Sequence, residues 1–280
     1  RREACGDCEQ AEVDSERIFT RIKSTLTRGR RRRILFRVAA VVIPVVLVLG
    51  VALRLDRQVG GIFSDAEYGE FVVDRGRRTQ CLFQDGTVAH LNSESKIHYP
   101  VKFGLFERRI RLEGEAYFEV ARNEQASFSV YTRDMNLQVL GTSFNIKAYP
   151  DETETVTTLL SGSIEQHYPS SRQTLKLLPS QQSHFDCHTG NLQILEADPE
   201  EVLAWKNGKF IARDKTLEEI FRELTRWYDF EVVFTRPALR QLRFHLHTNR
   251  YASIREILDN LQSTNGIHFS YIGNKIYISQ

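Results

Sequence analysis

The sequence predicts a membrane-anchored protein with a single transmembrane helix, an all-β domain and a small, internally duplicated α+β domain. Three observations predict this architecture. An uncharged apolar stretch follows a cluster of arginines, short alternating strands with glycine turns fill the middle of the chain, and apolar residues at helical spacing mark its last third. The composition of the 280 residues, 41% hydrophobic and 26% charged, is that of a globular protein of about two domains.

Residues 34–54 are predicted to cross a membrane. Residues 38–53 read VAAVVIPVVLVLGVAL without a charge, and residues 34–36 lengthen the apolar stretch, with Arg37 as the one interruption. About twenty helical residues span about 30 Å, the thickness of the hydrocarbon core. A buried core helix would need a polar face towards water, which this stretch lacks. A signal peptide would need a small-residue cleavage pattern, and none follows Leu53.

The arginine cluster orients the predicted span. Two arginines and an aspartate follow the span, whereas six arginines lie at its start: Arg28, Arg30, Arg31, Arg32, Arg33 and Arg37. The positive-inside rule therefore places residues 1–33 in the cytoplasm and the chain beyond about Arg54 outside it. Beside a span, the arginines fit anionic lipid better than DNA, and a net charge of +2 gives no general case for nucleic-acid binding. Residues 1–33 are too short to form a core without upstream residues or a partner.

After a linker at residues 55–66, residues 67–197 are predicted to form the all-β domain. Turn pairs separate short alternating strands at Asp85-Gly86, Glu113-Gly114, Ser161-Gly162 and Thr189-Gly190. Two stretches look alike, because residues 109–120 (RIRLEGEAYFEV) and 155–166 (TVTTLLSGSIEQ) each place a glycine turn between two strands. Regular short strands predict a sandwich or a β-roll, and the pattern leaves that choice open.

Residues 198–280 are predicted to form the α+β domain, in the order βαβ-βαββ. Thr216 with Glu219, and Ser253 with Glu256, have the spacing of capping boxes, and each precedes a helix with one apolar face. Strands flank both helices, and Gly273-Asn274 predicts a hairpin between the last two strands. The apolar helix faces are expected to pack on the sheet.

The aromatic anchors of this α+β domain are expected mainly to fill its core: Trp205, Phe210, Trp227 and Tyr228. A partner could also be received by strand addition at an exposed sheet edge. We place that edge, as a hypothesis, along the last strand, residues 275–278.

No catalytic, cofactor-binding or metal-binding residue is predicted, and the chain is not expected to be an enzyme. It lacks the Gly-x-Ser-x-Gly, His-Glu-x-x-His and Walker motifs. Cys5 and Cys8 form a Cys-x-x-Cys pair, which is half a zinc site, a redox pair or an exposed thiol pair, and no second pair follows.

The remaining histidines and cysteines form no complete ligand set. His184 and His188, with Cys187 beside them, have ligand chemistry at loose spacing, and His245 and His247 form a pair without a third ligand. Cys81 and Cys187 fall on the predicted oxidising side of the membrane and could form a disulfide, but their geometry stays open.

Several of these stretches resemble the FecR-type anti-sigma factors. The resemblance lies in residues 85–99 (DGTVAHLNSESKIHY), 109–120, 141–149 (GTSFNIKAY) and 155–165. Residues 205–210 (WKNGKF) and 217–234 (LEEIFRELTRWYDFEVVF) are similar to the C-terminal domain of members that pair with TonB-dependent transducers. That domain is in turn similar to the short signalling domain of secretins and TonB-dependent receptors.

The resemblance implies a relay in iron or nutrient uptake. A TonB-dependent outer-membrane transducer would present its signalling domain in the periplasm, and the inner-membrane anti-sigma factor would pass the signal to an extracytoplasmic-function sigma factor in the cytoplasm. The family's sigma-binding region usually exceeds residues 1–33 in length, so no sigma-binding residue is assigned, and inhibition alone or inhibition with activation stays open. The alternative is a membrane-anchored periplasmic scaffold or binding module without a role in transcription.

Overall fold

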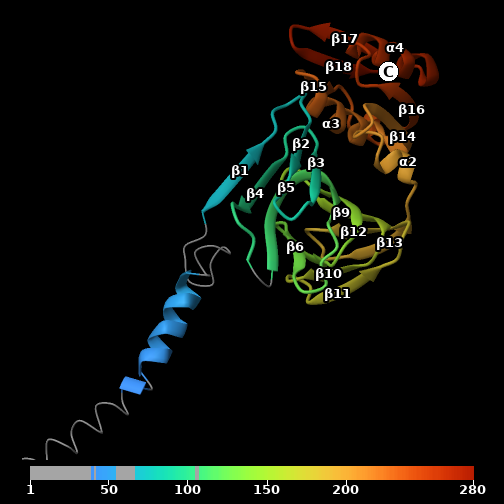
Figure 1. The fold of residues 1–280 in the computed structure, drawn as a ribbon. Coiled ribbons are helices and arrows are strands. Elements are labelled where there is room, and N and C mark those ends of the chain that lie inside the picture. Colours follow the sequence, from blue (N-terminus) through green and yellow to red (C-terminus); the bar gives the residue numbers. More distant parts are fainter. Residues whose placement is uncertain (1–38, 41, 55–66, 105–106) are drawn as a thin grey trace, which may run out of the picture. The chain divides into compact units, whose positions relative to one another are not determined.

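The computed structural model describes residues 39–40, 42–54, 67–104 and 107–280 (Figure 1). The chain divides into two units, residues 1–58 and 59–280. In the first unit residues 39–40 and 42–54 are helical, and the large apolar side chains between residues 42 and 53 are exposed, Val48 by 70%. Among the described residues, no helix is both long and apolar enough to cross a membrane. The predicted span at residues 34–54 lies partly outside the described residues, and residues 1–33 and the linker lie wholly outside them.

The β domain, strands β1 to β13, consists of two sheets that share the long strand β5. One sheet has the strand order β1 (Tyr68–Val72), β4 (Lys96–Pro100), β5 (Glu107–Glu119), β6 (Ser127–Tyr131), β7 (Asn136–Val139), β10 (Ile164–Tyr168) and β11 (Gln173–Leu177). The other has the order β2 (Thr79–Leu82), β3 (Val88–Leu91), β5, β8 (Ser143–Ala148), β9 (Glu154–Ser161), β12 (Gln181–Asp186) and β13 (Leu192–Glu196). All pairs are antiparallel except β5 with β6.

One apolar core receives side chains from both sheets, which identifies the domain as a sandwich. Phe128 from the first sheet and Phe118 and Phe144 from the second are fully buried in the same cluster. The rings of Phe118 and Phe144 stack with their centroids 5.2 Å apart. This shared core decides between the sandwich and the β-roll, which the sequence left open.

Strand β5 changes sheets at Gly114. Its first half pairs with β4 and β6, and its second half pairs with β3 and β8. Gly114 has a φ of +100°, and a Cβ atom there would lie 2.5 Å from Oγ of Ser95. The turn predicted at Glu113-Gly114 is therefore wrong, because the strand continues through the glycine. The turn predicted at Ser161-Gly162 is confirmed, between β9 and β10, where the chain also passes from one sheet to the other.

The C-terminal domain, α2 to β18, has the predicted βαβ-βαββ order. Its elements are α2 (Pro199–Val202), β14 (Lys209–Thr216), α3 (Leu217–Trp227), β15 (Glu231–Phe234), the 3₁₀ helix η1 (Pro237–Gln241), β16 (Arg243–Asn249), α4 (Ile254–Asn265), β17 (His268–Ile272) and β18 (Lys275–Ser279). Both capping boxes form, at the starts of α3 and α4. Strands β14 and β16 pair with each other, and β15, β18 and β17 form a second sheet.

The hypothesis that the last strand offers a free edge is wrong. Strand β18 lies between β15, to which it is parallel, and β17, to which it is antiparallel. Within the part of the chain that the structure describes, the two edge strands of this sheet are β15 and β17, and on β17 Tyr271 and Ile272 are 44% and 64% exposed. The order of the strands in the sheet differs from their order along the chain, because β18 pairs in parallel with β15, which is distant in the sequence.

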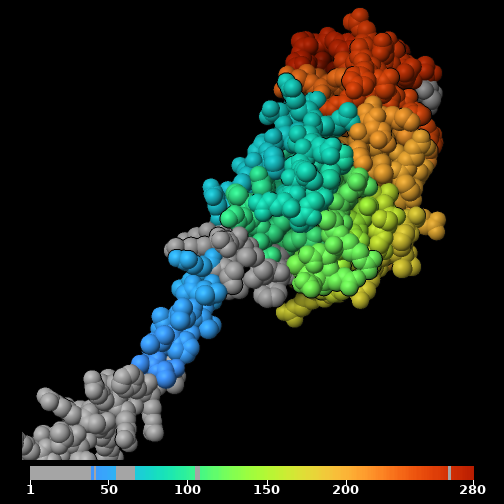
Figure 2. Space-filling view, viewed as in Figure 1, coloured from blue at the N-terminus to red at the C-terminus, as the bar shows by residue number. Residues whose placement is uncertain are grey.

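The C-terminal domain contacts the turn between β1 and β2 and the turn between β3 and β4. The N–H of Gly76 donates to the carbonyl of Arg226 at 2.9 Å, and Nη2 of Arg250 donates to Oγ of Ser93 at 3.0 Å. In the space-filling view the cyan residues of the turn between β1 and β2 and the orange residues of the C-terminal domain form a continuous surface (Figure 2). The two domains therefore share an interface with direct polar contacts.

The sheet-switching glycine gives a first prediction. Gly114→Ala is expected to lower the free energy of unfolding by about 2–4 kcal/mol, since both the backbone conformation and the contact with Ser95 oppose a Cβ atom. Gly190→Ala is the matched control, because Gly190 also has a positive φ, +70°, but a Cβ there would lie 3.8 Å from Ser171. Urea denaturation followed by circular dichroism measures both, and equal losses would contradict the role given to Ser95.

Candidate functional site at the interface of the two folded domains

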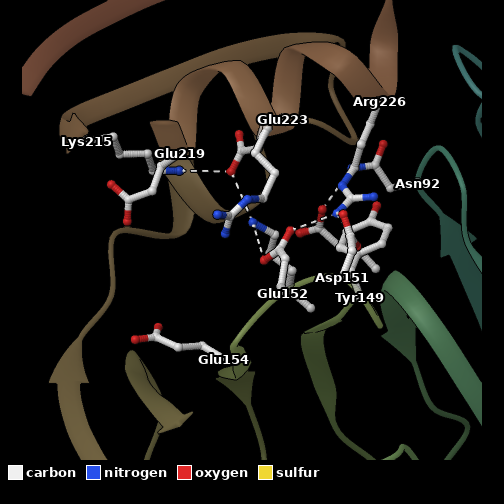
Figure 3. A network of polar contacts seen from close by, with 12 residues as sticks. Asn92, Tyr149, Asp151, Glu152, Glu154, Lys215, Glu219, Glu223 and Arg226 are labelled. Atoms are coloured by element: carbon white, nitrogen blue, oxygen red, sulfur yellow. Dashed lines mark hydrogen bonds and ion pairs between the residues drawn. The ribbon is translucent and has the colours of Figure 1, made fainter. Parts of the chain in front are cut away.

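Helix α3 directs two charged side chains at the β domain. Glu223 and Arg226 are three residues apart, so they lie on one side of the helix. Figure 3 shows both pointing from the helix towards Tyr149, Asp151 and Glu152, which follow strand β8. The opposite side of α3 packs its apolar residues into the core of the C-terminal domain.

Arg226 is the most heavily paired residue of this interface and is only 6% exposed. Its Nη2 atom donates to both carboxylate oxygens of Asp151, at 2.7 and 2.8 Å, and to Glu152 at 3.1 Å. Its Nη1 atom donates to Glu94 at 3.1 Å, and its guanidinium lies 3.5 Å from the ring centroid of Tyr149. Burial alone would lower the pKa of Arg226, but the hydrogen bonds and charges of Asp151 and Glu152 raise it. The guanidinium therefore stays charged in the interface.

A second ion-pair group joins the domains through Glu223. Its Oε1 atom lies 3.3 Å from Nζ of Lys147, on β8, and 3.3 Å from Nζ of Lys215, on β14. Lys147 also contacts Glu152, at 3.1 Å, which links this group to Arg226. Burial pushes the pKa of Glu223 upward, but the attraction of Lys215 and Lys147 outweighs it and holds the value at about 2. Glu223 is therefore ionised over the physiological range.

Glu115, on β5, lies beneath this network and is 9% exposed. Its carboxylate accepts hydrogen bonds from Nδ2 of Asn92 at 2.8 Å and from Nδ2 of Asn145 at 3.0 Å. Burial raises the pKa of Glu115, and it outweighs the opposing charge of Lys147. The β domain thus presents the buried carboxyl group of Glu115 beside the half-buried ammonium group of Lys147 to the C-terminal domain.

These residues line a cleft of about 500 Å³ along the interface. The charged side chains in it are largely paired with one another, as Arg226 is with Asp151 and Glu223 with Lys215. Such an arrangement fixes one domain on the other and holds no nucleophile activated by a base. In the described ranges there is also no group of three or more His, Cys, Asp or Glu side chains placed to hold a metal ion.

Cys81, His245 and His247 do not line the interface cleft, whereas His184 does. Cys187 and His188 share a smaller pocket with Asp151 and Glu152 of the network. Cys81 is buried in β2, and burial raises the pKa of its thiol to about 11. Cys187 contacts Asp134, with the Sγ and Oδ2 atoms 3.1 Å apart. The structure holds both cysteines as free thiols, so it does not contain the disulfide left open above. Cys5 and Cys8 lie outside the described residues.

The structure shows the surroundings of three of the histidines named in the sequence analysis. His184 lines the interface cleft and pairs through Nδ1 with Glu154 at 3.1 Å. His245 and His247 are exposed on one face of β16, as their alternation predicted.

The aromatic anchors fill the core of the C-terminal domain, which confirms that prediction. Trp205, Phe210 and Trp227 are buried there, and Tyr228 packs against them half-buried while its hydroxyl donates to the carbonyl of Ala252 at 2.8 Å. No pattern in the sequence predicted that Arg226 and Glu223 pair with the β domain. Charged residues beside an apolar helix stripe are usually solvated, and their partners here lie far away along the chain.

Comparison with known proteins agrees with this architecture. The family model described as FecR protein matches residues 70–165, and the one described as FecR, C-terminal, matches residues 209–278. The chain belongs to the FecR family. The FecR match runs from β1 to β10 and the FecR C-terminal match from β14 to β18, which confirms the resemblance seen in the sequence.

Solved structures give a second line of comparison for this FecR protein. Two crystal structures of a candidate anti-sigma factor from Parabacteroides distasonis ATCC 8503 are 28% identical to it, with TM-scores of 0.71 and 0.70. Each match covers 76% of this chain and 99% of the other. A comparison with the curated proteins found no match. The family and these structures support an anti-sigma factor role, which is regulatory rather than catalytic.

The interface network gives a second prediction. Glu223→Gln leaves Lys147 and Lys215 with one buried carboxylate fewer and is expected to lower the free energy of unfolding by about 2–4 kcal/mol at neutral pH. Glu231→Gln is the control, since Glu231 pairs with Lys275 at 2.8 Å but is 64% exposed and should matter little. Urea denaturation of the full chain in detergent micelles measures both.

The same variant has a pH signature. The pKa of Glu223 is about 2 in the folded protein and 4.5 without these contacts, so its stabilisation is complete above pH 4.5 and is lost as the pH falls towards 2. Glu223→Gln should flatten the loss of stability in that window. An unchanged pH dependence would show that the carboxylate is not held by the two lysines.

Proposed function

We propose that this FecR-family protein is a single-pass inner-membrane anti-sigma factor. It relays a periplasmic signal from a TonB-dependent outer-membrane transducer to a cytoplasmic extracytoplasmic-function sigma factor. One observation carries the proposal: the FecR and FecR C-terminal regions follow, in this order, an uncharged apolar stretch that begins at an arginine cluster. A periplasmic receiver and a cytoplasmic output need such a crossing between them.

The described part of the predicted span supports a membrane anchor. Residues 42–54 are helical, and their large apolar side chains are about half to two-thirds exposed on all sides, Val46 by 60% and Leu49 by 58%. A helix without a polar face is stable where lipid or other apolar groups surround it. The C-terminal side of residue 54 would then lie in the periplasm, as the charge asymmetry indicates.

Strand β17 offers a docking edge for the transducer's signalling domain. It pairs on one side with β18, and the N–H of Phe269 turns away from β18 to donate to Oε1 of Gln262 at 3.3 Å. Because N–H directions alternate along a strand, the N–H of Tyr271 points the same way, towards the free edge. Unpaired backbone groups of this kind accept an added strand.

The edge hypothesis is testable with one residue. Tyr271→Pro removes the outward N–H without breaking a bond to β18, and a proline is tolerated on an edge strand of this kind. We expect it to weaken binding of the full chain to the transducer's N-terminal signalling domain at least tenfold by calorimetry. Tyr271→Ser, which removes the ring but keeps the N–H, is the control. Equal binding by Tyr271→Pro and the unmodified protein would exclude strand addition at β17.

Co-purification tests the proposed output. The full chain, extracted from membranes, is expected to carry a sigma factor of the extracytoplasmic-function class, identified by mass spectrometry. Deletion of residues 1–33 should leave the protein in the membrane fraction but remove the sigma factor. Recovery of the full chain from membranes without a sigma factor would favour a periplasmic scaffold instead.

A further inference from the structure

A second pocket lies on the same interface, beside the turn between β1 and β2. It has a volume of about 570 Å³, within the range of small-molecule sites. Its lining comes from both domains: Gly76, Arg77, Arg78, Thr79, Gln80 and His90 from the β domain, and Trp205, Lys206, Trp227, Arg250 and Tyr251 from the C-terminal domain.

This basic pocket differs from the interface cleft in its charge. Three arginines, a lysine and a histidine line it, and no carboxylate does. The interface cleft, in contrast, contains Glu115, Glu152 and Glu223 beside its cations. The basic pocket therefore has an excess of positive charge, whereas the interface cleft is nearly balanced.

The arginines of the basic pocket have no carboxylate partners among the described residues. Arg78 donates to the backbone carbonyls of Trp205 and Lys206, the latter at 2.8 Å. Arg250 donates to Oγ of Ser93 at 3.0 Å and lies over the ring of Trp227, and the exposed side chain of Arg77 makes no ion pair within the described ranges. Only Lys206 contacts a carboxylate, that of Glu119 at 3.1 Å.

Two residues that line this pocket each have a buried donor without an acceptor in the structure, Nη1 of Arg250 and Nε1 of Trp205, and Trp205 also lines the interface cleft. Trp205 is 7% exposed. Both atoms can only donate, and a buried donor without an acceptor costs about 1–3 kcal/mol. Burial and the nearby charge of Arg78 lower the pKa of Arg250, and burial and Lys206 lower that of His90, which agrees with a positive field in the pocket.

We propose that the basic pocket binds a small oxyanion, a phosphate or carboxylate group, through Arg77, Arg250 and Trp205. Guanidinium groups match the paired oxygens of such ions, and an indole N–H adds a directed donor. A small ion is favoured over an acidic peptide because the cations without a carboxylate partner are gathered in one pocket of about 570 Å³. Since the donors come from both domains, the bound ion also ties the C-terminal domain to the β domain.

The test uses the full chain in detergent micelles, titrated by calorimetry with inorganic phosphate and with citrate at constant ionic strength against chloride. We expect saturable binding of at least one of the two ions and a rise in the unfolding temperature with its concentration. Arg250→Gln is expected to weaken that binding at least tenfold and Arg77→Ala several-fold. Arg111→Ala, which removes an exposed arginine of β5 outside the pocket, is the matched control and should bind as the unmodified protein does.

Each possible result either supports or overturns the proposal. No saturable binding of either ion, or equal binding by the Arg77→Ala and Arg111→Ala variants, overturns the proposal. Binding of a glutamate-rich peptide without binding of phosphate or citrate also overturns it, in favour of a peptide site. If Arg250→Gln does not fold, Arg77→Ala still decides, because that side chain has no partner in the fold to lose. The result does not depend on whether a sigma factor is bound.

Discussion

The buried guanidinium of Arg226 is the constraint on which the arrangement of the two domains depends. An arginine cannot give up its charge in a protein, so a position that is 6% exposed requires partners for it. The structure supplies them from the β domain alone, as Asp151, Glu152 and Glu94. Separation of the domains would expose the guanidinium to water and remove it from the three carboxylates. The ion pair of Glu223 with Lys147 and the contact of Arg250 with Ser93 also join the two domains in this orientation.

Local rules in the sequence account for the elements of this fold better than for their pairing. The capping boxes at Thr216 and Ser253 could be predicted because the residues that form them are three positions apart. Gly114 was misread because a glycine between two apolar runs is typical of a turn, and only pairing with four other strands shows that β5 continues through it. The position of β18 depends on its parallel pairing with β15, and the partners of Arg226 lie at least 74 residues away along the chain, so no local pattern contains either.

The two pockets of this interface differ in their balance of charges. In the interface cleft the fold brings acids and bases together, so their charges are compensated within the protein. In the basic pocket the cations face each other, and carbonyls and a hydroxyl provide only partial compensation. A fold that holds Arg78 near Arg250 needs a counter-charge from elsewhere or accepts their repulsion. An oxyanion would remove that repulsion and strengthen the contact that Arg250 already makes with the β domain.

A polar interface suits a relay better than an apolar one of equal area would. A protein passes on a signal when partner binding shifts an equilibrium between two arrangements, and the shift cannot exceed the partner's difference in affinity for them. Opening an apolar interface would expose apolar surface to water, and hydration of that surface would not offset the lost contacts. Opening one built from Arg226, Glu223 and Lys147 returns charged groups to water, so much of the lost attraction is recovered as hydration. In the proposed relay, the free-energy difference between a closed and an open arrangement would therefore be smaller than the number of polar contacts suggests.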